Sequence, residues 1–176
     1  MKKKIFSILT VLAMITLLTS TVSAGGNVGL GSVKFAIGSL IATGTFTGLG
    51  GYKQGVDVEL SASGNPVVLC TNQGENQAPG QNPAKLSVVG NQFIGPQLIT
   101  KKGTAPLDVT AEPGPITGTQ GGCPNDNWSA EIVSVSWTNA TISVYDNKTG
   151  ALLLQKNYLC DPAQQTSTSV SCTEIE

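Results

Sequence analysis

Four cysteines, Cys70, Cys123, Cys160 and Cys172, are the most reactive side chains in this 176-residue sequence. A cysteine becomes a catalytic nucleophile when a base such as histidine activates it, and the sequence contains no histidine. The spacing also lacks the Cys-x-x-Cys pairs that are typical of zinc sites. An even number of cysteines in a secreted chain predicts disulfides. We expect two, a long-range Cys70–Cys123 bridge and a local Cys160–Cys172 bridge.

Carboxylates are the remaining candidates for catalysis, because a Ser-His pair cannot form without histidine and neither Ser-x-x-Lys nor Gly-x-Ser-x-Gly occurs. Two carboxylates about 5–10 Å apart can hydrolyse a glycosidic bond. The same residues are also typical of outward-facing strand positions that keep a sheet soluble. We therefore predict no enzyme activity and keep a carboxylate-dependent carbohydrate-active enzyme as an alternative. Its candidate residues are Asp57, Glu59, Asp108, Glu112 and Glu131.

Amide, carboxylate and aromatic side chains gather in polar segments, and this combination predicts a weak binding site for a glycan or an extracellular protein. A Cys70–Cys123 bridge would bring the amide-rich loop 71–83 towards the Trp128 region. The alternative for Trp128 is a place in the hydrophobic core. The predicted ligand-binding residues are Trp128, Asn125, Asp126, Asn72, Gln73 and Tyr52.

Two oxygen-rich segments, residues 125–127 and 146–147, resemble turns as much as calcium loops. Neither has the ligand spacing of an EF-hand, in which side-chain oxygens recur at fixed positions of a 12-residue loop. We therefore predict no metal and no cofactor.

The first 24 residues have the composition of a secretory signal peptide: three lysines at 2–4, an apolar run at 5–18 and small residues before Gly25. That apolar run is shorter than the roughly 20 residues that span a bilayer. We expect a secreted protein, extracellular, periplasmic or on the cell surface, without a membrane span in the mature chain. Its seven lysines against 11 acidic residues, with no arginine, give a net charge of −4. Such a surface lacks the clustered cations of a nucleic-acid partner.

Apolar and polar residues alternate along the mature chain, and turn residues interrupt the alternation at short intervals. This pattern predicts strands rather than helices. Residues 25–176 should form a single antiparallel β-sandwich of Ig-like or fibronectin-like size, with about eight to ten short strands and two disulfides.

Several turns are expected inside this pattern, at residues 63–66, 90–91 and 138–139. The first should close a hairpin between strands 56–60 and 67–70. Short strand-like runs are also expected at 85–89, 93–94, 98–100 and 107–111. Strands 152–160 and 167–175 should be cross-linked by Cys160–Cys172. The expected core of the 130–160 region is Val133, Val135, Trp137, Ile142 and Val144.

These features together predict a secreted, non-catalytic module with an extracellular binding role or a structural role at the cell surface. One alternative rests on the mature N-terminus, where an alternating segment follows Gly25 and Gly26. Such a segment can complete the sheet of a neighbouring subunit, which would make the protein a homo-oligomeric filament or matrix subunit. It can equally pair within its own domain.

Overall fold

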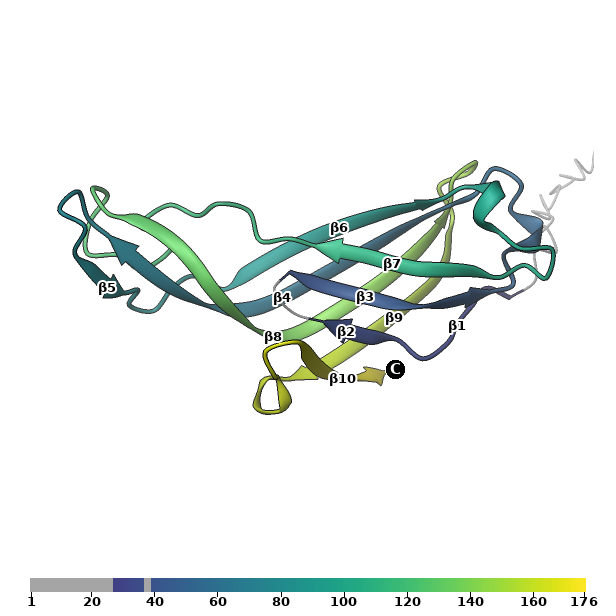
Figure 1. The fold of residues 1–176 in the computed structure, drawn as a ribbon. Helices are drawn as coiled ribbons and strands as arrows, with labels where there is room; N and C mark the ends of the chain where they lie inside the picture. Colours follow the sequence, from purple (N-terminus) through teal and green to yellow (C-terminus); the bar gives the residue numbers. More distant parts are fainter. Residues whose placement is uncertain (1–26, 37–38) are drawn as a thin grey trace, which may run out of the picture.

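The computed structural model describes residues 27–36 and 39–176, and the predicted signal peptide lies outside them. The described chain is built from ten strands, all paired antiparallel, and three short 3-10 helices (Figure 1). The prediction of an antiparallel all-β fold with two disulfides is confirmed. The strands are β1 (Gly29–Leu30), β2 (Lys34–Ala36), β3 (Leu40–Thr47), β4 (Val56–Thr71), β5 (Gln77–Pro79), β6 (Leu86–Ile94), β7 (Ala105–Ala111), β8 (Ser129–Asp146), β9 (Leu152–Asp161) and β10 (Ser169–Ile175). The 3-10 helices are η1 (Leu49–Gly51), η2 (Pro96–Leu98) and η3 (Pro162–Gln164).

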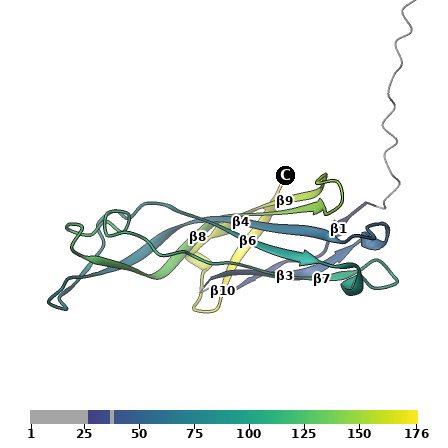
Figure 2. The same cartoon turned by 90° about the horizontal axis from the view of Figure 1, so that it is seen from above.

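The sheet folds back on itself into two layers (Figure 2). Strands β6, β4, β8 and β9 pair in that order, and β10 links them to β2, β3 and β7. The two ends of this series, β6 and β7, lie next to each other. There the Gln92 carboxamide of β6 bonds to the backbone of β7 as a peptide group of a paired strand would. It accepts from the Asp108 N–H at 2.9 Å and donates to the Pro106 carbonyl at 3.4 Å.

Alternating residues of both layers fill one hydrophobic core, as the period of two predicts. In β4 the even-numbered residues from Val56 to Ala62 are buried, whereas Asp57 and Glu59 point to the outer face. Strand β3 contributes Leu40, Ala42 and Phe46, and all three are fully buried. The N-terminal strands therefore pair and pack within their own chain, with β3 between β7 and the β1–β2 edge.

Two strands are much longer than predicted, because two expected turns are absent. Strand β4 has 16 residues and runs through 63–66, and β8 has 18 residues and runs through 138–139. At the shared position the ladder passes from the pair Ser63–Asn139 to the pair Gly64–Trp137. Thr138 is thus the extra residue of a β-bulge, which shifts the side-chain phase without reversing the chain.

Gly90 and Asn91 do not break β6 either, so one strand replaces the two short runs expected there. A Cβ on Gly90 would clash with the Thr110 carbonyl oxygen. The glycine therefore serves the close approach of β6 to β7 rather than a turn. The other corrections are minor: η2 occupies part of the strand expected at 98–100, and β5 lies inside the expected loop 71–83.

The predicted core residues Val135, Trp137, Ile142 and Val144 are buried, but Val133 is 55% exposed. A second bulge explains why Val133 is exposed although it was predicted to lie in the core. The ladder passes from Val67–Ser134 to Val68–Ile132, so Val133 has no partner of its own on β4 and leaves the inward face.

Beyond the first bulge, β4 and β8 continue away from the two-layer body as an extension, in which the short strand β5 also pairs with β4 (Figure 1). We call this extension the arm. It comprises residues 65–71 of β4, 129–136 of β8, strand β5 and the loops 72–85 and 112–128. No helix in the described part of the chain is long and apolar enough to cross a membrane.

Candidate functional site

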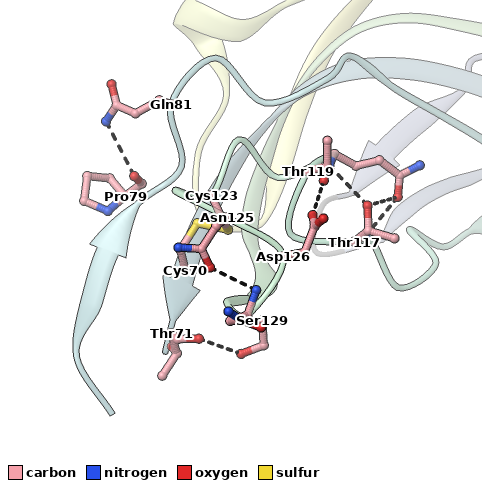
Figure 3. Close-up of a disulfide and its surroundings, with 12 residues drawn as sticks. Cys70, Thr71, Pro79, Gln81, Thr117, Thr119, Cys123, Asn125, Asp126 and Ser129 are labelled. Atoms are coloured by element: carbon pink, nitrogen blue, oxygen red, sulfur yellow. Dashed lines mark hydrogen bonds between the residues drawn. A yellow bond between two sulfur atoms is a disulfide. The ribbon is translucent and has the colours of Figure 1, made fainter. Parts of the chain in front are cut away.

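The arm is closed by the predicted Cys70–Cys123 disulfide, which attaches loop 112–128 to the end of β4 (Figure 3). The Cα atoms of this pair are 5.7 Å apart. The second predicted bridge, Cys160–Cys172, joins directly opposed residues of β9 and β10. All four cysteines are therefore used in disulfides.

Backbone contacts hold the two arm loops against each other. The Gln81 N–H donates to the Gly122 carbonyl at 2.8 Å, and the Ala84 N–H donates to the Gln120 carbonyl at 2.9 Å. A Cβ on Gly121 would stand 2.7 Å from the Ala130 Cβ. The glycines thus allow the loop to lie directly on the arm strands.

Three of the predicted ligand-binding residues use their side-chain oxygens to hold these loops. Asn125 Oδ1 accepts from the Asn127 N–H at 3.0 Å, and the Asp126 carboxylate accepts from the Thr119 hydroxyl (Figure 3). Asn72 Oδ1 accepts from two backbone N–H groups, those of residues 74 and 76, each at 2.9 Å. These are the local bonds by which Asn and Asp stabilise turns.

The structure brings five of the six predicted residues to the arm and places the sixth elsewhere. Trp128 is half-buried, and it precedes the last ladder pair of the arm, Thr71–Ser129, which Asn72 and the exposed Gln73 follow. Tyr52 lies between η1 and β4 in the segment that joins β3 to β4, and this segment is at the opposite end of the molecule from β5 (Figure 1). Tyr52 is therefore not part of one site with Trp128.

The five candidate carboxylates are spread over β4, β7, β8 and the segment after β7, and Asp57 and Glu59 share a strand. Asp57 and Glu59 are on the outer face of β4, Asp108 is on β7, Glu112 directly follows β7, and Glu131 is on β8 in the arm. Within residues 27–36 and 39–176, no three His, Cys, Asp or Glu side chains gather closely enough to hold a metal ion.

A groove of about 670 Å³ lies along the arm part of β8. It is lined by residues 113–116 of the proline-rich segment after β7, which we call the wall residues, by residues 130–135 of β8 and by Ser167. Most of the lining is apolar, and Glu131 is its only charged residue. The lining residues are Pro113, Gly114, Pro115, Ile116, Ala130, Glu131, Ile132, Val133, Ser134, Val135 and Ser167.

The groove borders a strand edge that no described strand covers. Strand β9 pairs with β8 only from Asn139 to Tyr145, whereas β4 pairs with the other edge along the whole of β8. Where β9 departs, the Gln165 side chain takes its place: Nε2 donates to the Val135 carbonyl at 2.6 Å, and Oε1 accepts from the Trp137 N–H at 3.2 Å.

The groove was not among the sequence-predicted sites, although the sequence carries one signal of it. Ile132 and Val133 are consecutive apolar residues in an otherwise alternating strand, which is the pattern of a bulge. The position of the wall residues 113–116 has no comparable signal, because it depends on where the Cys70–Cys123 bridge holds their loop.

Comparison with known protein families and with curated proteins found no match for this chain. The geometry of the site is therefore the basis for assigning a function.

Proposed function

We propose that the chain is a secreted, non-catalytic module that binds an extracellular ligand in the groove beside β8. The observation that carries this proposal is the groove itself. Its volume of about 670 Å³ lies within the range of roughly 300–1,000 Å³ typical of ligand pockets.

The apolar lining with one carboxylate supports ligand binding. Binding sites are lined mainly by apolar side chains, and a few polar groups fix the orientation of the ligand. Val133 is 55% exposed beside the groove, and the bulge directs it there. Bulges frequently re-aim a side chain at a functional site.

The covalent framework supports a preformed site. The loop that carries wall residues 113–116 is held at one end by β7 and at the other by the Cys70–Cys123 bridge. A preformed groove loses less conformational entropy when a ligand binds. Two disulfides are also typical of proteins in oxidising, non-cytoplasmic compartments, which supports secretion.

The residues of the groove also favour binding over catalysis. Glycoside hydrolysis of the usual kind needs two carboxylates, and the groove lining contains one, Glu131. The chain has no histidine to act as a general base.

A pair of matched substitutions tests the proposal. Val133 and Val89 are both valines on strands and are both 55% exposed, but only Val133 lines the groove. The secreted form, residues 25–176, is screened against a glycan array and a displayed library of random heptapeptides. Val133→Asn should weaken binding of the selected ligands by about tenfold or more, whereas Val89→Asn should leave it unchanged.

Equal losses of ligand affinity in the two variants, or no loss of affinity in either, would place the ligand outside the groove and contradict the proposal. Failure of both libraries to yield a ligand would contradict it as well. Circular dichroism spectra of both variants show whether the fold is retained.

A further inference from the structure

We infer that the ligand is an extended polypeptide that adds to the free edge of β8 as a further strand. This inference rests on the proposed binding groove and specifies the chemical class of its ligand.

The first argument is the unpaired edge. Residues 129–136 of β8 pair with β4 on one side, and no described strand pairs with them on the other. A strand edge presents a row of N–H and C=O groups, and another polypeptide backbone is the partner that satisfies them in sequence. The eight residues of this stretch span about 24 Å, which is seven steps of roughly 3.4 Å each.

The second argument is the contact that Gln165 makes at the start of this edge. Its carboxamide bonds to the Val135 carbonyl and the Trp137 N–H as a peptide group of a neighbouring strand would. Ser167, two residues later, lines the groove. An added strand would therefore continue the ladder from the point where this side chain ends it.

The third argument is complementarity of charge and apolar surface. Glu131 is the only charged residue of the lining, and the mature chain carries a net charge of −4, so a basic residue in the ligand is favoured. Ile132 and the 55% exposed Val133 offer apolar contacts to the side chains of an extended peptide. The ligand we infer is thus an extended peptide with alternating apolar residues and at least one Lys or Arg.

The fourth argument is the weak protection of this edge. Proteins block open strand edges with charged side chains, proline, bulges or a covering segment. Residues 129–136 (SAEIVSVS) contain neither lysine nor proline, and their protective features are Glu131 and the bulge at Val133. In the body, by contrast, the Gln92 contact joins β6 to β7.

The experiment uses the heptapeptides selected on the secreted form, each synthesised with single N-methyl groups at successive positions. In an added strand, alternate N–H groups face β8 and the others face away. N-methylation should therefore weaken binding by about tenfold or more at every second position, and have little effect at the positions between. Hydrogen exchange of the β8 amides at 129–135 should slow when the unmodified peptide binds.

Other outcomes separate this inference from the proposed function. Peptides that need Val133 but show no alternating N-methyl effect would retain the binding groove and overturn strand addition. Binding of glycans but of no peptide in the groove would also retain the binding groove and overturn strand addition. If no ligand depends on Val133, both proposals fail.

The charge argument has its own test. Glu131→Lys should weaken selected peptides that contain Lys or Arg by about tenfold. Asp108→Lys makes the same change of charge on β7, outside the groove lining, and should have little effect. Equal effects of the two substitutions would show a general charge effect and overturn the assigned contact with Glu131.

Discussion

The body and the arm are held together by different interactions. In the body, side chains from both layers meet in one core, and twelve of the large side chains there are less than 2% exposed, including Phe46, Leu60 and Trp137. In the arm, two strands are covered by loops that rely on backbone hydrogen bonds, close-packed glycines and one disulfide. Val68 and Cys70 are buried there outside the core cluster, whereas Val135, at the end of the arm next to the body, belongs to that cluster.

This difference explains where the candidate site lies. Burial of apolar surface is the main stabilising term in a domain, and the body gathers apolar side chains from both of its layers into one core. The arm derives rigidity from a covalent link and from backbone bonds, and it leaves both an apolar groove and a strand edge accessible. Function is thus expected in the part of the sheet that is stabilised with the least side-chain packing.

The two tryptophans give the largest expected contrast. Trp137 is fully buried in the body core, and its indole N–H has no hydrogen-bond partner among the described residues, so its contribution comes from packing. Trp137→Ala should lower the free energy of unfolding by about 3–5 kcal/mol. Trp128→Ala, at a half-buried arm position, should lower it by about 1 kcal/mol. Urea unfolding followed by circular dichroism measures both values.

Trp137→Phe is the control, because it keeps most of the packing and should cost clearly less than the alanine variant. A loss for Trp128→Ala as large as that for Trp137→Ala would show that the arm and the body share one core, against the comparison drawn above.

The disulfides test how strongly the arm and the body are coupled. The Cys70–Cys123 bridge closes a loop of 53 residues that contains the body strands β6 and β7, whereas Cys160–Cys172 closes 12 residues. On the chain-entropy account, replacing the first pair with alanines should cost about 4 kcal/mol and the second about 3 kcal/mol. The bridge in the arm should therefore stabilise the body more than the bridge in the body does.

Urea unfolding of the two double variants measures these losses, and amide exchange locates them. Removal of Cys70–Cys123 could instead lower the free energy of unfolding by less than removal of Cys160–Cys172 does. The arm would then open independently of the body, and its bridge would not restrain the unfolded body.

The sequence was sufficient for the parts of the fold that depend on alternation and covalent chemistry. The period of two predicted the buried residues of β4 and β7, and the even cysteine count with its spacing predicted both disulfides. It was insufficient at positions 63–66 and 138–139, where residues typical of turns form a bulge instead. Pairing with a neighbouring strand decides between the two, and that information is not local.

The candidate site was only partly predictable for the same reason. The polar residues Asn72, Asn125 and Asp126 have the composition of a binding site, but the same oxygens satisfy backbone groups of their own loops. The groove depends on a bulge, on the departure of β9 after Asn139 and on the course of residues 113–116. Each of these is a relation between distant segments.

Tyr158 gives the smallest expected effect and confines it to the body. Its hydroxyl is buried in β9 without a hydrogen-bond partner among the described residues, and its ring packs against Phe35 at 5.1 Å between centroids. Burial, with a smaller contribution from the nearby Glu174 carboxylate, raises the pKa of Tyr158 to about 12 from an ordinary value of 10. Between pH 10 and 12 the unfolded chain therefore loses this proton while the folded chain keeps it. The stability of the body should be unaffected by this group below pH 10 and should fall above it by at most about 1.4 kcal/mol per pH unit.

Tyr158→Phe separates this effect from other alkaline changes. It removes the titrating group and an unpaired buried hydroxyl, so at neutral pH it should alter the free energy of unfolding by less than about 1 kcal/mol. Above pH 10 the variant should lose less stability than the unsubstituted protein, because lysine deprotonation acts on both proteins alike. Parallel stability curves for the two proteins between pH 9 and 12 would contradict the raised pKa. If the arm amides lost protection from exchange more steeply than the body amides, the effect could not be assigned to the body.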